Sequence, residues 1–258
     1  MIDIHTHILP GVDDGAKTEA DSLEMAKVAV EQGIQTIIAT PHHRNGAFDN
    51  YKEEIITNVQ ILNELLEENK IPLEILVGQE VRIYGELLDD LAEGDIQTLA
   101  DTSYILVEFP FGDVPQYAER LLYDLQQKGL RPIIAHPERN RELIENHDRM
   151  YELIRNGALA QLTGASLLGE YGKEIEQFSH QLIEANLVHF IASDAHNTDS
   201  RGFTLQEAYH VIRERYGFEL SYMFEENSQL LLDDSIVNRN EPNRIHKKKS
   251  FFNFLRRK

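Results

Sequence analysis

Residues 2–15 of the chain read IDIHTHILPGVDDG. The first four of these residues form a short strand candidate, which leads directly into His5-Thr6-His7. In many open α/β sheets a glycine-rich, phosphate-binding loop follows the first strand, and that fingerprint is absent here. The stretch therefore indicates a strand end that carries imidazoles rather than a nucleotide-binding loop.

Outward from this stretch, short runs rich in Ile, Val and Leu alternate with longer amphipathic segments. The predicted strands are residues 2–5, 36–40, 74–79, 104–108, 131–136, 159–163 and 188–192, and the predicted helices are residues 21–32, 51–69, 116–128, 150–156, 174–185 and 205–216. Gly33, Gly129 and Gly157 follow three of these helices, where a left-handed residue is often needed. The alternation predicts an α/β fold, either an open sheet or a closed barrel.

The composition limits the kind of protein this can be. The chain has 258 residues, with 44 acidic side chains, 25 basic side chains and no cysteine. Its length suits one domain of barrel size. The absence of cysteine excludes disulfides, thiol nucleophiles and thiolate metal sites. The net charge of −19 argues against a general nucleic-acid binder, which needs clustered Lys and Arg.

Residues that can bind metal ions lie at or just after six of the seven predicted strands. They are His5, His7, His42, Glu80, Glu108, His136, Asp194 and His196. Each residue has an ordinary alternative explanation, such as a turn histidine or a helix cap. Chance does not readily explain why six separate strand ends all carry such residues. In a (β/α) barrel the strand ends converge on one face. The sequence therefore predicts a site for two or three divalent ions, and such ligands without sulfur suit manganese, iron or zinc.

The spacing within two motifs suits a shared ion. Side chains two residues apart in an extended segment point to the same side, so His5 and His7 can reach one ion together. Asp194 and His196 have the same spacing. Both pairs are therefore expected to direct their side chains to the site.

Two arginines follow these motifs and indicate the kind of substrate. Arg139 lies three residues after His136, and Arg201 lies five residues after His196. A guanidinium group presents a planar set of donors that suits phosphate oxygens. A surface salt bridge is the alternative for either arginine. Their position after two separate ligand motifs favours binding of a phosphate group.

The motifs IDIHTHILPGVDDG, ATPHH, VGQEVR, ILVEFP, IIAHPERN and IASDAHN together resemble the polymerase and histidinol phosphatase (PHP) superfamily, and more closely its CpsB/CapC group of bacterial tyrosine-protein phosphatases from capsule and exopolysaccharide loci. The resemblance covers residues 1–230. It implies a distorted (β/α)7 barrel, three divalent ions, usually Mn²⁺ (with Fe, Zn and Mg as alternatives), and hydrolysis of phosphotyrosine on proteins, notably on a bacterial tyrosine kinase.

The resemblance also implies a ligand set. One ion would be held by His5, His7, Glu80 and Asp194, and a second by Glu80, Glu108 and His136; the third would be held by Asp14, His42 and His196. Arg139 and Arg201 match the arginines of the family that contact phosphate. Asp13 and His43 are the neighbouring alternatives to Asp14 and His42.

Several other functions remain open from sequence. A small-molecule phosphatase acting on histidinol phosphate, or an exonuclease, would share the same motifs. An amidohydrolase also has an HxH motif after its first strand, but its bridging lysine would stand where this chain has Glu108. A metal-stabilised regulatory scaffold is the alternative outside the enzymes. For the tyrosine phosphatase that the resemblance implies, we expect a metal-activated water to attack phosphorus without formation of a phosphoenzyme.

The end of the chain differs from the rest. We expect a barrel over residues 1–238 and a tail over residues 239–258, which has eight Lys or Arg and a single acid. The tail also has three phenylalanines, which suits contact with an anionic membrane surface; a disordered end, or one docked on the acidic body, is the alternative. With no signal peptide or apolar span in the sequence, we expect a cytoplasmic protein, peripheral to the membrane if the tail binds it. The sequence leaves open whether the chain forms a homo-oligomer.

Overall fold

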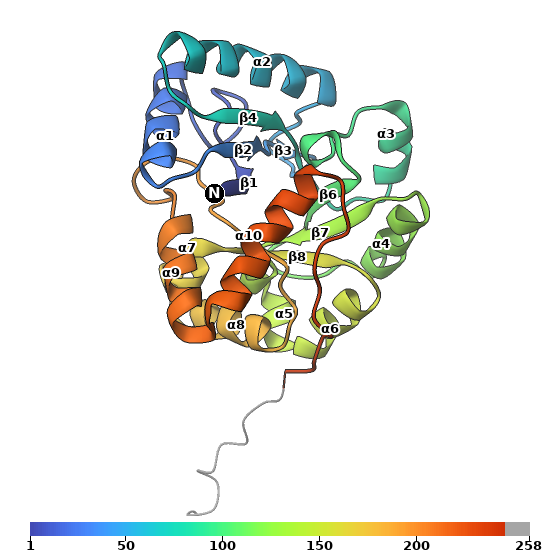
Figure 1. Ribbon diagram of the computed structural model, residues 1–258. Helices are drawn as coiled ribbons and strands as arrows, with labels where there is room; N and C mark the ends of the chain where they lie inside the picture. The colour runs from blue at the N-terminus through green and yellow to red at the C-terminus, as the bar shows by residue number, and fades with distance from the viewer. Residues whose placement is uncertain (246–258) are drawn as a thin grey trace, which may run out of the picture.

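The computed structural model describes residues 1–245. Its helices surround a central group of parallel strands (Figure 1), so the expected α/β fold is confirmed. The strands are β1 (Ile2–Thr6), β2 (Thr36–Ala39), β3 (His42–His43), β4 (Glu74–Val77), β5 (Glu80–Arg82), β6 (Tyr104–Glu108), β7 (Arg131–Ala135), β8 (Leu159–Thr163) and β9 (Phe190–Ala192).

The strands form two sheets rather than one closed barrel. One sheet has the order β1-β2-β4 and the other β3-β5-β6-β7-β8-β9, and all pairs are parallel. β1 approaches β9 through a single parallel bridge between Thr6 and Ala195, with the His7 N–H donating to the Ala195 carbonyl at 2.8 Å. The expectation of a distorted barrel is therefore confirmed, and the distortion consists of this split.

The two strands that the sequence did not predict, β3 and β5, explain the split. β3 follows β2 after Thr40 and Pro41, and β5 follows β4 after Gly78 and Gln79. Proline has no N–H to give to a strand ladder. A Cβ on Gly78 would lie 2.5 Å from Cγ2 of Ile38, so only glycine fits this close approach. The strands predicted at residues 36–40 and 74–79 therefore end before His42 and Glu80, and each is followed by a short strand that belongs to the other sheet.

Helices cover the outside of the strands. They are α1 (Glu19–Glu31), α2 (Lys52–Glu68), α3 (Leu87–Glu93), α4 (Ala118–Gln127), α5 (Arg141–Glu145), α6 (His147–Arg155), α7 (Gly164–Leu167), α8 (Lys173–Glu184), α9 (Leu205–Tyr216) and α10 (Phe218–Leu232). The six predicted helices are all present. Gly33, Gly129 and Gly157 have φ values of 80°, 85° and 105°, as expected after a helix.

The sequence pattern does not predict the long helix α10. Its buried face includes Ser221, Asn227 and Ser228 as well as Phe224 and Leu231, so polar residues interrupt the apolar period. α10 packs against β1, β9 and α9, and it crosses the open end of the strands in Figure 1. Its Leu231 joins the core inside the strands, so this helix closes the barrel at the end opposite to the carboxyl ends of the strands.

The hydrophobic core has two parts. Side chains from successive strands, among them Ile4, Tyr104, Ile133 and Phe190, fill the space inside the strands. A larger cluster lies between the outer faces of the strands and the helices. Because apolar side chains fill most of the interior, most of the buried imidazoles and carboxylates gather where the strands end.

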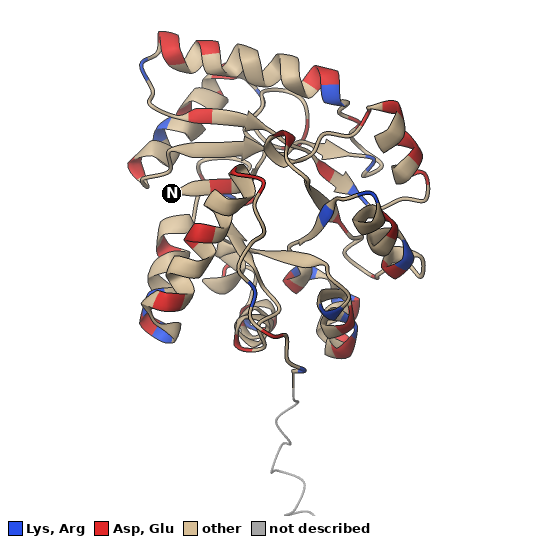
Figure 2. Ribbon diagram, turned by 45° about the vertical axis from the view of Figure 1, so that its right-hand side comes forward, with Lys and Arg blue, Asp and Glu red and all other residues tan. Residues whose placement is uncertain are grey.

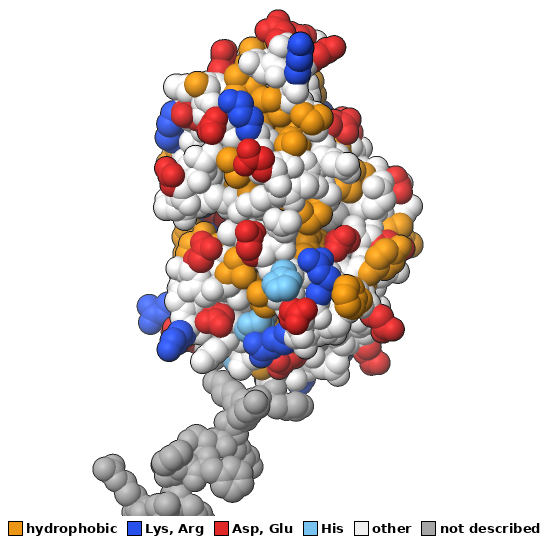
Figure 3. All heavy atoms as spheres, turned by 60° about the vertical axis from the view of Figure 1, so that its left-hand side comes forward, with side chains coloured by type: hydrophobic (Ala, Val, Ile, Leu, Met, Phe, Trp, Pro, Cys, Tyr) orange, Lys and Arg blue, Asp and Glu red, His pale blue; other side chains and the backbone are white. Residues whose placement is uncertain are grey.

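Lys, Arg, Asp and Glu residues lie mainly on the helices and connecting segments (Figure 2). On the face drawn in Figure 3, acidic, basic and hydrophobic side chains are intermingled, with no broad basic area among residues 1–245. Within the same residues, none of the helices combines the length and apolar character that a bilayer span requires.

The expected boundary at residue 238 falls in a segment that packs on the barrel. Arg239 donates to the Ile154 carbonyl at 3.0 Å, and Arg244 forms ion pairs with Asp148 and Glu152 on α6. Residues 246–258, which include most of the basic tail, lie outside the described part of the chain. The division into barrel and tail, and the membrane contact of the tail, stay predictions.

Candidate metal centre

Side chains that can bind metal ions meet where the parallel strands end. His5 lies in β1 and His7 just after it; His42 and Glu80 begin β3 and β5; Glu108 ends β6; His136 follows β7, and Asp194 and His196 follow β9. Asp14 joins them from the loop between β1 and α1. The structure therefore brings all nine predicted ligands to one place, because parallel strands of a barrel have their carboxyl ends on one face.

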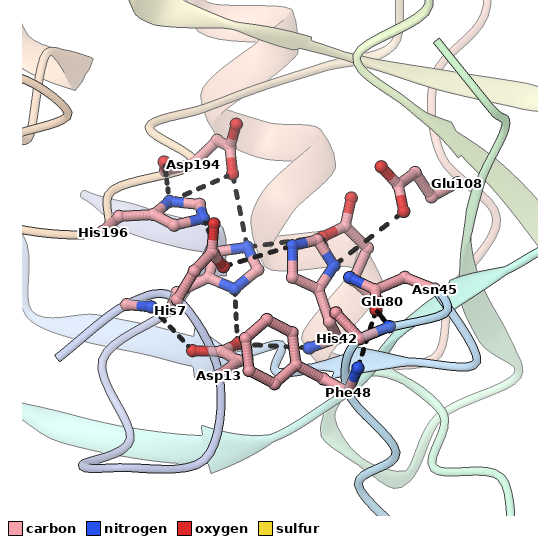
Figure 4. A network of polar contacts seen from close by, with 12 residues as sticks. His7, Asp13, His42, Asn45, Phe48, Glu80, Glu108, Asp194 and His196 are labelled. Carbon is pink, nitrogen blue, oxygen red and sulfur yellow. Dashed lines mark hydrogen bonds and ion pairs between the residues drawn. The ribbon is translucent and has the colours of Figure 1, made fainter. Parts of the chain in front are cut away.

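The carboxylate of Glu80 lies at the middle of this cluster (Figure 4). Its oxygens lie 2.7 Å from Nε2 of His136, 2.9 Å from Nδ1 of His42 and 3.3 Å from Nε2 of both His5 and His7. Glu80 is fully buried. A buried carboxylate without partners costs several kcal/mol, so these imidazoles are needed for the group to be there at all.

Asp194 is the second carboxylate that joins several histidines. Its Oδ1 lies 3.4 Å from Nε2 of His5 and 3.3 Å from Nε2 of His7. The same oxygen lies 3.6 Å from Nδ1 of His196. Two carboxylates therefore face the same pair of imidazole nitrogens, as expected for groups that share a cation.

Hydrogen bonds orient three of the histidines in the same manner. Nδ1 of His5 contacts the amide oxygen of Gln161 at 2.9 Å, Nδ1 of His7 contacts the Asp13 carboxylate at 2.7 Å, and Nδ1 of His196 contacts the Asp194 carbonyl at 2.8 Å. Amide and carboxylate oxygens accept, so each Nδ1 donates. Each Nε2 is then left for the cluster, which is the arrangement usual for histidines that bind metals.

The structure distinguishes the neighbouring alternatives. Asp14 Oδ1 lies 3.4 Å from His42 Nε2 and 3.3 Å from His196 Nε2, whereas Asp13 orients His7 from behind. His43 is buried against Tyr51, with ring centroids 5.2 Å apart, and has no contact with the cluster among those found in the described residues. Asp14 and His42 are therefore the two that face the site.

Two residues reach the cluster through an unusual backbone. His136 has a φ of 32° and Asp194 a φ of 54°, both in the left-handed region that non-glycine residues rarely adopt. The expectation that Asp194 and His196 align as two residues of an extended strand was therefore wrong. Such backbone strain is concentrated at functional sites, where the surrounding structure holds it in place.

Both predicted arginines lie beside the cluster. Arg139 donates to Asp194 Oδ2 at 2.6 Å, and Arg201 lies 3.1 Å from Asp14 Oδ2 and 3.6 Å from Asp194 Oδ2. Arg139 is mostly buried and Arg201 is about one-third exposed. The two guanidinium groups thus converge on the carboxylates of Asp194 and Asp14.

The pKa values in the cluster show how strongly it attracts positive charge. Burial alone would lower the pKa of His42, but Glu80 and Asp14 raise it to about 10. Burial and the Glu80 carboxylate raise the pKa of Glu108 to about 7. Burial would raise the pKa of Glu80 as well, but His42 and His5 hold it well below its ordinary value. The carboxylates therefore require either protonated histidines or bound cations.

The donor set fits divalent ions. Three groups of residues have ligand atoms within 4.8 Å of one another: His7, Asp14, His42 and His196; His5, His7 and Glu80; and His42, Glu80 and Glu108. Several buried atoms of these groups make no hydrogen bond, namely His42 Nδ1, Glu80 Oε2, Glu108 Oε2 and His196 Nε2. Buried polar atoms are nearly always satisfied in proteins, so these atoms are suited to coordinate cations.

Three supporting residues were not assigned this role from the sequence. Gln161 and Asp13 orient His5 and His7, and Arg82 forms an ion pair with Glu108 at 2.9 Å. Gln161 could have been noticed, because it is a polar residue between Ala160 and Leu162 in the middle of strand β8. Arg82 and Asp13 carry no such signal, because a charged residue beside a ligand motif is usually a surface residue.

The fold and the site define a class of protein: a parallel α/β barrel with a buried cluster of imidazoles and carboxylates, suited to divalent ions, beside two arginines. The family described as capsular polysaccharide synthesis, CpsB/CapC, matches residues 1–233. The chain belongs to this family, as the sequence motifs predicted.

Individual relatives agree with this assignment. The chain is 53% identical to tyrosine-protein phosphatase YwqE of Bacillus subtilis (strain 168) over 251 residues, covering 97% of this chain and 99% of the relative. It is 33% identical to tyrosine-protein phosphatase CpsB of Streptococcus agalactiae serotype III (strain NEM316), covering 92% of this chain and all of that relative.

Solved structures agree as well. Crystal structures of YwqE from Bacillus subtilis and CpsB from Streptococcus pneumoniae describe unique metal-dependent tyrosine phosphatases; the matched chain has a TM-score of 0.94 and 53% identity, and the match covers 96% of this chain and 100% of that chain. A phosphotriesterase homology protein from Escherichia coli matches with a TM-score of 0.54 at 14% identity, covering 89% of this chain and 97% of that chain. At this level of identity the second match concerns the fold alone.

The orientation of His7 by Asp13 gives the first prediction. We predict that Asp13→Ala lowers the affinity for Mn²⁺ by about 10- to 100-fold, because His7 loses the acceptor that leaves its Nε2 free. The measurement is calorimetric titration of metal-free protein with Mn²⁺. Asp199→Ala, at an exposed position in the loop after His196, is the matched control. Equal affinities in both variants would contradict the orienting role.

Proposed function

We propose that this protein is a metal-dependent protein-tyrosine phosphatase. The observation that carries the proposal is the convergence of nine imidazole and carboxylate side chains with Arg139 and Arg201 at one end of the barrel. The relatives named as tyrosine-protein phosphatases support it, since they match nearly the whole chain.

The proposed ligand assignment follows the family pattern and fits the contacts. His5, His7, Glu80 and Asp194 would hold one ion; Glu80, Glu108 and His136 a second; and Asp14, His42 and His196 a third. Divalent ions bound here would supply Lewis-acid polarisation of the phosphate and a water of lowered pKa. With four carboxylates and no sulfur among the ligands, Mn²⁺ is the ion we propose.

The remaining chemistry belongs to the protein side chains. Arg139 and Arg201 would turn from Asp194 and Asp14 to the non-bridging phosphate oxygens and neutralise charge as the phosphorus–oxygen bond breaks. A phenol has a pKa of about 10, so the departing tyrosyl oxygen needs little help from an acid. With no cysteine in the chain, the cysteinyl-phosphate route is excluded by composition.

The proposed substrate is a tyrosine-phosphorylated protein of capsule or exopolysaccharide synthesis, and a bacterial tyrosine kinase in particular. The description of the family supports the setting. Hydrolysis of the kinase phosphotyrosine would couple this enzyme to polysaccharide output. The alternatives are a small-molecule phosphomonoesterase, such as one for histidinol phosphate, and a metal-stabilised scaffold without turnover.

A comparison of substrates tests the proposal. Mn²⁺-loaded protein should hydrolyse a phosphotyrosine peptide faster than the matched phosphoserine peptide or histidinol phosphate. EDTA should abolish turnover and added Mn²⁺ should restore it, and Glu80→Ala or His136→Ala should remove nearly all activity because the cluster loses its shared groups. Preference for histidinol phosphate, or full activity after EDTA treatment, would reject the proposal.

The arginines separate an enzyme from a scaffold. We expect Arg139→Ala and Arg201→Ala to lower kcat/KM for phosphotyrosine by roughly 10- to 100-fold each, because a charge-assisted hydrogen bond to phosphate is lost. Bound metal, measured by elemental analysis, should stay unchanged. Arg141→Ala removes an exposed arginine that pairs with Glu145 on its own helix and serves as control. If all three variants turn over equally, the arginines do not act on phosphate.

We further propose that residues 246–258 bind an anionic membrane surface, which would hold the enzyme at the membrane. This segment has six Lys or Arg and three phenylalanines, and each basic residue near anionic headgroups contributes on the order of 1 kcal/mol. The full chain should sediment with phosphatidylserine vesicles, and a chain ending at Ile245 should not. Equal sedimentation of the two would exclude the tail as the membrane contact.

A further inference from the structure

Two phenylalanine rings lie against the histidines of the metal centre. The Phe48 ring is nearly parallel to the His42 ring, with centroids 6.3 Å apart and planes inclined by 8° (Figure 4). The Phe111 ring stands in the same way against His136, at 6.2 Å and 20°. Each ring therefore packs on a different predicted ligand, and Phe111 also lies beside Arg139.

The segments that carry these rings are held by polar contacts. The Asn45 side-chain oxygen accepts from the N–H groups of Ala47 and Phe48, both at 2.9 Å. On the other segment, Asn140 donates to the carbonyls of Pro110 and Asp113 at 2.7 and 2.9 Å. The Phe111 carbonyl accepts from the Arg141 N–H at 2.8 Å. The backbone next to each ring is therefore fixed.

Despite this support, the rings stay open to water. Phe111 is 56% exposed, and Phe48 is partly exposed. Holding an apolar ring in water forgoes the free energy that its burial would supply. Rigid segments that present apolar rings at the edge of a polar site indicate a ligand with an apolar part.

The position of Arg139 shows where that part would lie. Its guanidinium carbon is 5.9 Å from the Phe111 ring centroid and 5.4 Å from the Tyr171 ring centroid. A phosphate bound by Arg139 would therefore lie near the Phe111 ring. A phenyl ring esterified to that phosphate could pack against Phe111, whereas the single methylene of phosphoserine offers little apolar surface.

We propose that Phe111, together with Phe48, is a specificity-determining residue that packs on the phenyl ring of phosphotyrosine. This contact makes the site prefer aryl phosphates to alkyl phosphates. The inference rests on the proposed function, because it concerns the substrate of the same site. Ring contact and burial stabilise an aryl ester and leave an alkyl ester almost unaffected.

The competing role for Phe111 is support of Arg139 through the cation–π contact. That role would affect every phosphate equally, because Arg139 binds the group that all substrates share. A ring contact affects aryl ligands alone. The ratio between aryl and alkyl ligands therefore separates the two roles.

The experiment uses phenylphosphonate and methylphosphonate, which mimic the two ester classes without being hydrolysed. Inhibition constants are measured on the Mn²⁺-loaded full chain, and on Phe111→Ala, Phe111→Leu and Phe48→Ala. Phe218→Ala, which removes an equally large ring that is 77% exposed on α10, is the matched control. A parallel assay measures kcat/KM for phosphotyrosine and phosphoserine peptides of one sequence.

We expect Phe111→Ala to raise the inhibition constant of phenylphosphonate about tenfold and to change that of methylphosphonate by less than about twofold. Phe111→Leu and Phe48→Ala should show a smaller rise that is again confined to phenylphosphonate. Phe218→Ala should change neither constant. Equal weakening of both phosphonates, or no change in either, would overturn the proposal. If the unaltered protein fails to cleave phosphotyrosine, the proposed function falls, while the phosphonate constants still report whether Phe111 contacts an aryl ring.

Discussion

The buried carboxylate of Glu80 is the group on which the site depends. Its two oxygens lie within 3.3 Å of nitrogens on four histidines that come from three strand regions: His5 and His7 at the end of β1, His42 in β3 and His136 after β7. An unpaired charge at this depth would cost several kcal/mol. The imidazoles that these strands bring together offset the cost of burying the Glu80 carboxylate. The same negative charge makes the site suitable for cations.

The backbone around Glu80 shows how the fold provides for this group. The chain breaks between β4 and β5 at Gly78 and Gln79, so that Glu80 leaves the first sheet and pairs beside His42 in the second. Gly78 fits against Ile38 at a distance that no side chain would allow. The split that distorts the barrel is therefore the feature that directs Glu80 and His42 inward.

Much of the fold and most of the site could be predicted from the sequence, for identifiable reasons. The seven strand positions were visible because each is a short apolar run, and the ligands were visible because imidazoles and carboxylates followed those runs. The breaks that create β3 and β5 could not be seen, since they depend on a close approach between strands far apart in sequence. Helix α10 was missed because Ser221, Asn227 and Ser228 lie on its buried face.

The supporting residues of the site were less predictable than the ligands themselves. Gln161 orients His5 across 156 positions of sequence, and only the packed structure shows that contact. The left-handed conformations of His136 and Asp194 likewise depend on tertiary contacts, because local propensity opposes them. The identity of the predicted ligands can therefore be read from the local sequence, whereas the orientation of their side chains depends on tertiary contacts.

Phosphate binding and selection among phosphate esters are assigned to different residues of the site. Clustered cations beside Arg139 and Arg201 would suit any phosphate monoester, so they do not by themselves distinguish one substrate from another. The ring of Phe111 lies beside Arg139, on a segment fixed by Asn140. Because this segment contributes no predicted ligand, its side chain can vary without disturbing the balance of charge around Glu80. Selection among phosphate esters can therefore change at Phe111 while the metal centre remains the same.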